Sequence, residues 1–291
     1  MNIAIVGLGL IGGSFCRTLK KHTFHRIMGI DRDPETIRKA LESGAIDEEI
    51  EVDRLSEANL TILCLYPEAI VDFVRENADR FKKGGIVTDS CGVKEYVVSR
   101  CTPILAEKGV IFVGTHPMAG REFSGFDYST DDLFEGASYI ITPTDETPQI
   151  AVDLLQTLAG SLGFGKAVVS TPKRHDEIIA YTSQLAHVVS NAYVKSPTML
   201  NFDGFSAGSF QDLTRVAKLN EYMWSELFMC NREALLNEID CILEKIAEYR
   251  DAIRDGRLDR LIEILRDGRE LKEASLRLYD EHASGKGNPH G

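Results

Sequence analysis

The stretch Gly7-Leu8-Gly9-Leu10-Ile11-Gly12 follows a short apolar run, Asn2-Ile3-Ala4-Ile5-Val6, and opens a segment with helical character. A short, β-rich apolar run predicts a buried parallel strand. In such a strand–turn–helix unit Gly7 permits the tight turn, Gly9 lets the backbone approach a pyrophosphate, and Gly12 allows the helix to pack closely on the strand. The stretch therefore predicts a dinucleotide-binding site.

Backbone groups would hold the phosphates. The helix expected from Leu10 presents unpaired N–H groups and the positive end of its dipole to an anion, so Leu8, Leu10 and Ile11 are expected to line the cofactor together with the glycines. The alternative is a glycine-rich turn that only packs tightly. The acid that follows about 20 residues later favours the dinucleotide site.

That acid is Asp31, at the end of the second apolar run, 27–31. A carboxylate at this position accepts hydrogen bonds from the adenosine ribose and repels a 2′-phosphate, which favours NAD as the cofactor. Arg32 beside it could stack on adenine, pair with a 2′-phosphate, or be a solvated surface charge.

The composition limits the classes of function. The chain has 291 residues, 43% hydrophobic and 27% charged, which is enough for a soluble protein of two domains. The net charge of −12 argues against nucleic acid or an anionic membrane as a partner. We expect no membrane span, no metal site, no signal peptide before the first strand and a cytoplasmic location, and the six cysteines show no CxxC spacing and are expected to be reduced.

Strand-like runs alternate with helical patterns over the first 170 residues, which predicts a doubly wound parallel sheet of the Rossmann type. The strand-like runs are 60–64, 85–88, 110–113, 139–142 and 167–169, and the helical patterns are 67–81, 94–107 and 147–162.

After Thr171-Pro172 the strand-like runs end, and 3.6-residue periodicity predicts only helices, at about 175–195, 210–218, 221–254 and 258–282. We therefore expect an α/β nucleotide-binding domain at 1–170, an all-helical domain for substrate binding and dimerisation at 171–283, and a disordered tail at 284–291. The apolar faces of these helices favour a homodimer.

An enzyme that oxidises an alcohol with a nicotinamide needs a base for the hydroxyl proton, and histidine titrates nearest to neutral pH. His116 follows the predicted strand 110–113 in the loop 114–122, at the carboxyl edge of the sheet where ligands bind. A hydrogen-bonded structural histidine is the alternative. His175 and His187, twelve residues apart on a predicted helix, are expected on nearly the same face.

Arg215 is the candidate for holding a substrate carboxylate, because a guanidinium matches a carboxylate in plane and donor spacing. An ion pair with Glu122 or Asp212 is equally consistent with the spacing.

Five segments together resemble the prephenate dehydrogenase family of tyrosine biosynthesis, in its order and spacing, from Met1 to about Leu278. They are the glycine stretch, Thr88-Asp89-Ser90-Cys91-Gly92-Val93-Lys94, Gly114-Thr115-His116-Pro117-Met118-Ala119-Gly120-Arg121-Glu122, His175-Asp176 with Ser183-Gln184-Leu185-Ala186-His187, and Asp212-Leu213-Thr214-Arg215. The resemblance implies NAD-dependent oxidative decarboxylation of prephenate to 4-hydroxyphenylpyruvate.

The resemblance also implies roles for single residues. His116 would be the catalytic histidine that accepts a hydrogen bond from the ring hydroxyl, and Arg215 would bind a substrate carboxylate. Glu122 would govern access to that arginine and its orientation, and His187 and Ser183 would line the substrate pocket.

Two positions depart from the family pattern. Ala186 stands where the family often has proline before the histidine, a change that we expect to matter little, and the other position is Gly92. Many members carry a serine that supports the catalytic histidine where this chain has Gly92, so we expect Ser90 or a water to orient His116. Cys91 next to it is expected to be a buried thiol rather than a nucleophile, because hydride transfer needs no covalent intermediate.

Three other functions stay open from the sequence. The same chemistry could act on arogenate. A β-hydroxyacid dehydrogenase would rely on a lysine of the helical half, such as Lys195 or Lys218. A catalytically silent NAD-binding sensor would reduce no NAD when given prephenate.

Overall fold

The computed structural model describes residues 1–121, 123–201 and 204–283. The chain forms two compact units, Met1–Leu235 and Leu236–Gly291, and each is described by itself. The first unit includes helices beyond residue 170 because these pack on two helices of the sheet region, α3 (Pro67–Asn77) and α4 (Glu95–Ala106). The domain boundary at residue 170 stays a prediction.

An eight-stranded sheet in the order β3-β2-β1-β4-β5-β6-β7-β8 forms the centre of the first unit. Its strands are β1 (Asn2–Val6), β2 (Arg26–Ile30), β3 (Glu48–Glu49), β4 (Leu60–Leu63), β5 (Ile86–Asp89), β6 (Ile111–Pro117), β7 (Ser138–Thr142) and β8 (Lys166–Val169). The doubly wound sheet is confirmed, with a short extra strand, β3.

One strand pair corrects the expectation of a purely parallel sheet. β6 and β7 run antiparallel, whereas every other neighbouring pair is parallel. A parallel pair needs a crossover of a dozen or more residues, usually helical, and the described part of the connection 118–137 holds only a short 3-10 helix, Phe126–Tyr128.

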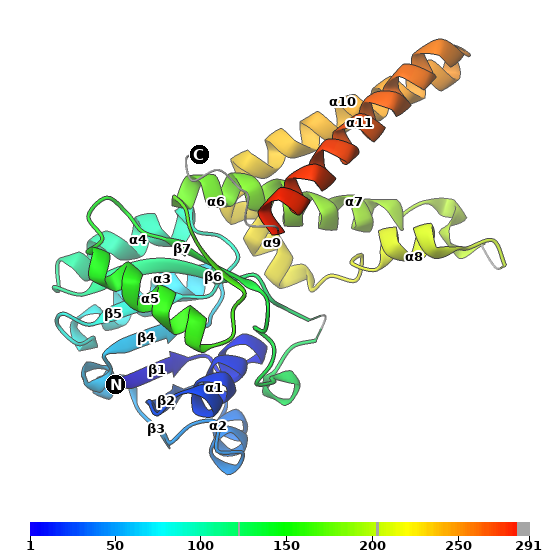
Figure 1. Cartoon of the computed structure of the whole chain (residues 1–291). Coiled ribbons are helices and arrows are strands. Elements are labelled where there is room, and N and C mark those ends of the chain that lie inside the picture. The colour runs from blue at the N-terminus through cyan, green and yellow to red at the C-terminus, as the bar shows by residue number, and fades with distance from the viewer. Residues whose placement is uncertain (122, 202–203, 284–291) are drawn as a thin grey trace. The chain divides into compact units, whose positions relative to one another are not determined.

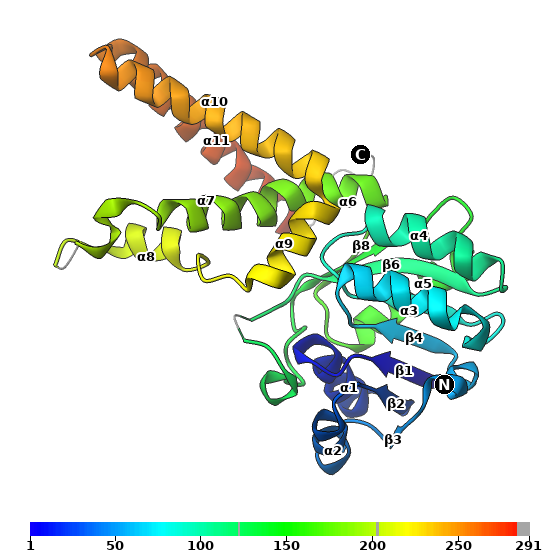
Figure 2. The ribbon, with the colours of Figure 1, turned by 180° about the vertical axis from the view of Figure 1, so that it is seen from behind.

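Helices cover both faces of the sheet (Figure 1; Figure 2). Alternate residues of β1 point to opposite faces, as the period of a strand requires: Ile3 and Ile5 belong to one core, and Ala4 and Val6 belong to the other. The first core includes α1 (Leu10–His22), α2 (Pro34–Glu42) and α5 (Gln149–Ser161), and the second includes α3 (Pro67–Asn77) and α4 (Glu95–Ala106).

The strand order reverses between β1 and β4. From β1 the chain continues to β2 and β3 on one side of the sheet, and from β4 it continues to the strands on the other side. Loops at the carboxyl ends of β1 and β4 therefore lead away from one another, which creates the crevice where open α/β sheets bind ligands.

The remaining helices of the first unit are α6 (Pro172–Ile179), α7 (Ala186–Tyr193), α8 (Gly208–Thr214) and α9 (Glu221–Cys230). The helix expected at 175–195 is interrupted by a π-helical segment, Ala180–Leu185. The helix expected at 221–254 is divided at Asn231, where α9 ends and α10 (Arg232–Arg254) begins.

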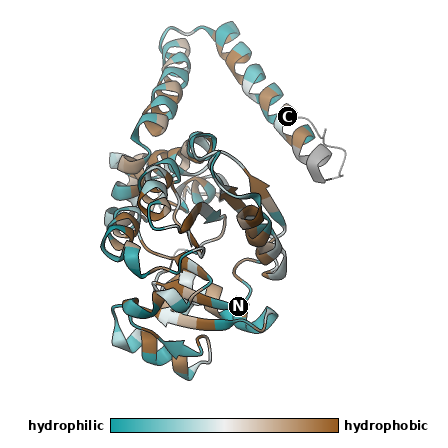
Figure 3. Cartoon of the chain, turned by 90° about the vertical axis from the view of Figure 1, so that its left-hand side faces the viewer, coloured by the Kyte–Doolittle hydropathy of each residue, from teal (hydrophilic) through white to brown (hydrophobic). Residues whose placement is uncertain are grey.

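The second unit consists of most of α10 and of α11 (Leu258–Ala283). An ion pair between Glu248 of α10 and Arg260 of α11, at 2.9 Å, joins the two helices. Apolar side chains lie exposed along both helices, where Figure 3 shows hydrophobic bands between hydrophilic ones. Those more than half exposed include Leu243, Ile246, Leu265 and Leu271. The predicted disordered tail, 284–291, lies outside the described residues.

None of the helices within the described residues is long and apolar enough to span a membrane.

Candidate active site

The glycine loop has the geometry of a dinucleotide cradle. Gly7 has φ +86°, and a Cβ on it would lie 2.6 Å from the carbonyl oxygen of Cys64 after β4. A Cβ on Gly12 would lie 1.8 Å from the Gly7 carbonyl oxygen. A Cβ on Gly9, by contrast, would meet nothing within 4 Å. The loop thus packs tightly through two glycines and leaves room for a ligand at the third.

The start of α1 suits an anion. Among the described residues no side chain caps this helix at Gly9, and its first turn, which begins with Leu10 and Ile11, contains no acid. The unpaired N–H groups and the helix dipole are therefore available to phosphates. Leu8 is fully buried, so its side chain is not available to line the cofactor.

Asp31 lies directly after β2 and is joined to this loop. Its carboxylate accepts hydrogen bonds from the backbone N–H groups of Leu8 at 2.6 Å and Asp33 at 3.0 Å. The exposed Arg32 follows it. The sheet edge thus brings the predicted cofactor residues together, and they fit a dinucleotide.

His116 lies inside β6 opposite Ile140 of β7, whereas the sequence placed it in a loop after the strand. The strand is longer than predicted because β7 pairs with it as far as Pro117. Burial lowers the pKa of His116 well below 6.5, and the neighbouring His175 and Lys94 lower it further. The imidazole is therefore neutral near pH 7.

His116 is hydrogen-bonded to a residue that was not predicted to contact it. Its Nδ1 lies 2.9 Å from Nε2 of His175, and Nδ1 of His175 lies 2.7 Å from Oδ1 of Asp176. Ser90, which was expected to orient His116, instead hydrogen-bonds with the Cys64 thiol. The adjacent pair His175-Asp176 at a helix start was the available signal, but its partner lies 59 residues away in the sequence.

Gly92 lies beside the opposite edge of the His116 ring. A Cβ at Gly92 would be 3.8 Å from Cε1 and 3.9 Å from Nε2 of His116, and 3.6 Å from a methyl carbon of Leu227 in α9. Within the described residues Nε2 of His116 has no hydrogen-bond partner. This nitrogen is therefore available to a ligand.

A buried ion pair lies beneath the strand segment that carries His116. Lys94 and Asp89 are fully buried and paired, Nζ of Lys94 donates to the Thr115 carbonyl at 2.7 Å, and the Thr115 N–H donates to Asp89 at 3.1 Å. Removing one partner of such a pair leaves an uncompensated buried charge. Burial raises the pKa of the neighbouring Cys91 well above its usual range, which supports the buried thiol rather than a nucleophile.

A second cluster surrounds His187 on α7. Its ring centroid lies 3.9 Å from that of Trp224 in α9, and its Nδ1 donates to the Val216 carbonyl at 3.3 Å. Burial lowers the pKa of His187, and the nearby charge of Arg215 lowers it further. The charge of Arg215 thus acts on His187.

Side chains of α7 hold the segment that carries Arg215. Ser190 donates to the Leu213 carbonyl at 2.7 Å and Asn191 donates to the Ala217 carbonyl at 3.0 Å. Arg215 itself is exposed just after α8. Ser183 is half-buried in the π-helical segment, and Glu122 lies outside the described residues.

Helix α9 connects the two histidine clusters. Trp224 contacts His187, and Leu227, one turn later, lies beside Gly92 and hence beside His116. His175 and His187, by contrast, have separate partners, because His175 bonds to His116 and His187 bonds to the Val216 carbonyl. Within the described residues, no group of three or more His, Cys, Asp or Glu side chains could hold a metal ion.

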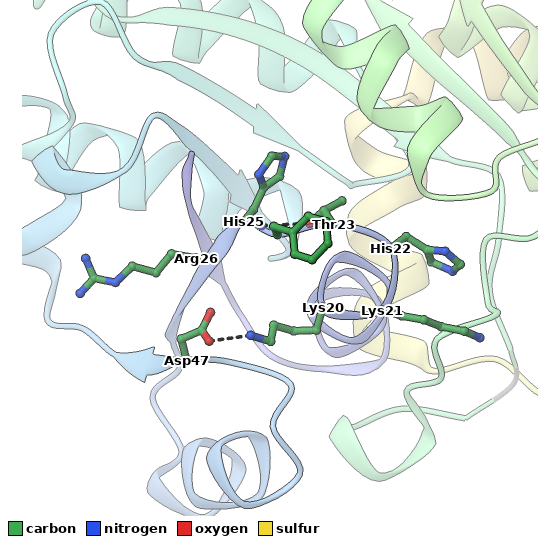
Figure 4. A pocket seen from close by; sticks show the side chains of 8 residues that line it. Lys20, Lys21, His22, Thr23, His25, Arg26 and Asp47 are labelled. Atoms are coloured by element: carbon green, nitrogen blue, oxygen red, sulfur yellow. Dashed lines mark hydrogen bonds and ion pairs between the residues drawn. The ribbon is translucent and has the colours of Figure 1, made fainter.

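A basic hollow at the amino ends of the strands is unrelated to this site (Figure 4). Its cations already have acidic partners: Lys20 pairs with Asp47, Lys21 pairs with Asp131 and Arg26 pairs with Glu48. These ion pairs neutralise the three cations, so the hollow has no cluster of unpaired positive charges that would bind an anion.

Comparison with known families decides what kind of protein carries this site. The nucleotide-binding domain of prephenate dehydrogenase matches residues 15–169, and its dimerization domain matches residues 171–267. The chain belongs to the prephenate dehydrogenase family.

Individual members of the family cover nearly the whole chain. The chain is 29% identical to the prephenate dehydrogenase of Bacillus subtilis, over 93% of its own length and 75% of the relative's. It is 30% identical to the cyclohexadienyl dehydrogenase of Zymomonas mobilis, over 97% of both chains. The prephenate dehydrogenase of Aquifex aeolicus in complex with hydroxyphenyl propionate and NAD+ has a TM-score of 0.84 at 29% identity, over 95% of this chain and 98% of that one. The Synechocystis arogenate dehydrogenase has a TM-score of 0.82 at 26% identity, over 94% and 100%.

The glycine loop yields a paired prediction. Gly9→Ala should fold normally, because its Cβ meets open space, but should weaken NAD binding at least tenfold by obstructing the close approach of the phosphates. Gly12→Ala should lower the melting temperature, because its Cβ would overlap the Gly7 carbonyl. Calorimetric unfolding measures the melting temperature of each variant, and titration with NAD measures its affinity for the cofactor. A Gly9→Ala variant that binds NAD normally would contradict the cradle.

Proposed function

We propose that this protein oxidises prephenate with NAD and releases carbon dioxide, forming 4-hydroxyphenylpyruvate. The observation that carries the proposal is a neutral, half-buried His116 whose Nε2 is available at the carboxyl edge of a nucleotide-binding sheet, in a chain of the prephenate dehydrogenase family. A neutral imidazole there is suited to accept a proton.

The reaction needs a base, an oriented ring and an anchored carboxylate. Nε2 of His116 takes the proton of the ring hydroxyl. The electron pair of the broken O–H bond forms the carbonyl, and the carbinol carbon loses its hydrogen together with both bonding electrons, as a hydride. Bound NAD supplies the acceptor for that hydride. The ring then loses its carboxylate as carbon dioxide, and the electrons of that C–C bond complete the aromatic ring and leave a phenolate oxygen. The protonated His116 returns its proton to that oxygen, which gives the hydroxyl of the product and restores the neutral base.

Arg215 is proposed to bind a carboxylate of the substrate. Its place beside His187, on a segment held by three α7 side chains, supports this role because a positioned guanidinium can bind a carboxylate with two parallel bonds. His187 and Ser183 are proposed to line the same pocket, and Glu122 to control access to the arginine.

The residues proposed to hold NAD are those of the glycine loop together with Asp31 and Arg32. The bonds from Leu8 and Asp33 fix the Asp31 carboxylate at the end of β2, where it would accept the ribose hydroxyls and repel a 2′-phosphate. This supports NAD over NADP.

We propose prephenate rather than arogenate as the substrate. An assay of NAD reduction with each of the two compounds decides between them. The relatives bear names that refer to prephenate, arogenate and cyclohexadienyl substrates. The β-hydroxyacid alternative has less support, since Lys195 and Lys218 are exposed and the family match points elsewhere.

A homodimer through the helical half is also proposed. The match to a dimerization domain and the exposed apolar side chains of α10 and α11 support it. All six cysteines are free thiols, which supports the reducing cytoplasm as the compartment.

The first test measures reduction of NAD by the purified protein with prephenate and, separately, with arogenate. His116→Asn should bind NAD as the wild type does but turn over roughly 10²–10⁴-fold more slowly, the usual scale for loss of a general base. His22→Asn, at an exposed histidine on the opposite edge of the sheet, is the matched control and should be fully active. A wild-type protein that oxidises neither substrate would refute the proposed function.

The acid limb of the pH profile follows from the lowered pKa of His116. The base must be neutral to accept a proton, so kcat/KM for prephenate should be constant near neutral pH and fall as pH drops through a midpoint below 6.5. The charged groups around the ring are Lys94, Asp89 and Asp176. A midpoint above 6.5 would argue for another base.

Arg215→Ala should raise KM for prephenate roughly 10- to 100-fold, which corresponds to a charge-assisted contact of about 1.5–3 kcal/mol. NAD affinity and the melting temperature should stay near wild-type values. Arg215→Lys should remain impaired because it loses the planar fork, and Lys218→Ala is the control for a neighbouring cation. Early melting with an unchanged KM would show that Arg215 is structural instead.

A further inference from the structure

His116, His175 and Asp176 form a continuous hydrogen-bonded chain in a buried setting. The Nδ1–Nε2 distance between the histidines is 2.9 Å, the Nδ1–Oδ1 distance from His175 to Asp176 is 2.7 Å, and the two rings meet edge to face at 66°. His175 is 3% exposed and Asp176 is 2% exposed. Water therefore has little access to the His175 and Asp176 side chains.

The backbone of α4 fixes the Asp176 end. Its Oδ1 accepts from the Lys94 N–H and its Oδ2 accepts from the Glu95 N–H, each at 2.8 Å, at the start of that helix. Backbone N–H groups can only donate, so both carboxylate oxygens act as acceptors there. The helix dipole also favours negative charge at this position.

The proton positions follow in sequence. Because Oδ1 of Asp176 accepts, Nδ1 of His175 carries its proton, and Nε2 of a neutral His175 must then be an acceptor. Nδ1 of His116 therefore donates to that Nε2. The remaining nitrogen of His116, Nε2, keeps an unshared electron pair on the side of the ring next to Gly92.

Within the part of the chain that the structure describes, no other group hydrogen-bonds to the His116 ring. Gly92 has no side chain, and the Ser90 hydroxyl is engaged with Cys64. The pair His175-Asp176 is itself held firmly, since Asn231 donates to the Asp176 carbonyl at 2.9 Å and to the buried Gln184 side chain at 2.8 Å.

We propose that His175 and Asp176 are positioning residues that hold His116 in its Nδ1–H form, so that Nε2 can take the proton of the substrate hydroxyl. This inference rests on the proposed function of His116 as the base. When Nε2 receives the proton, His116 becomes an imidazolium whose Nδ1–H still donates to His175, and the Asp176 carboxylate stabilises the new charge through His175.

A matched pair of variants tests the acceptor at position 175. His175→Met and His175→Gln place side chains of similar size there, but only glutamine keeps an oxygen that can accept from Nδ1 of His116. We expect His175→Met to lower kcat about 100-fold or more while KM for prephenate and NAD affinity change less than about threefold. His175→Gln should recover at least tenfold of the lost kcat. Equal loss in the two variants, or wild-type kcat in His175→Met, would overturn the proposal.

A second measurement does not depend on catalysis. Nitrogen-15 NMR of histidine side chains in the full-length wild-type protein should show His116 protonated at Nδ1 and unprotonated at Nε2, with the signal assigned by its loss in His116→Asn. His116 protonated at Nε2 would overturn the proposal even if the enzyme oxidises prephenate. If the enzyme proves inactive on prephenate, the proposed function fails, whereas this spectrum still decides the inference.

Discussion

The carboxylate of Asp176 is the contact on which the site depends. It accepts two backbone hydrogen bonds at the start of α4 and a third from His175, so one side chain holds α6 against the start of α4. A buried carboxylate with this many donors is stabilised by hydrogen bonding and by the helix terminus together. His116 acquires its orientation at the end of this chain of contacts.

Charge is distributed to suit an anionic substrate in an acidic protein. The chain carries a net charge of −12, so binding of a dicarboxylate requires local positive groups rather than a general field. The buried Lys94 is neutralised by Asp89 and serves the framework. The exposed Arg215 beside His187 is proposed to bind the carboxylate, and the backbone N–H groups at the start of α1 are proposed to bind the phosphates.

Local patterns explain why much of the fold could be predicted from sequence. The glycine stretch specifies a turn that a Cβ at Gly7 or Gly12 would obstruct. The short apolar run before it correctly predicts β1 as a buried parallel strand. The family resemblance is likewise confirmed, because it rests on segments that keep their order and spacing.

Contacts between distant segments explain what could not be predicted. The length of β6 depends on antiparallel pairing with β7, and the orientation of His116 depends on a residue 59 positions away. The π-helical segment at Ala180–Leu185 has no local signal of the kind that marks a cap or a turn. The individual roles of the predicted site residues stay predictions, those of the catalytic candidates His116 and Arg215 included.

The most direct test is a crystal structure of the protein with NAD and 4-hydroxyphenylpyruvate. The proposed mechanism requires that the phenolic hydroxyl lies about 3 Å from Nε2 of His116, that Nδ1 of His116 remains bonded to His175, and that a carboxylate contacts Arg215. A hydroxyl bound away from Nε2, or a His116 ring turned so that Nδ1 faces the ligand, would contradict it.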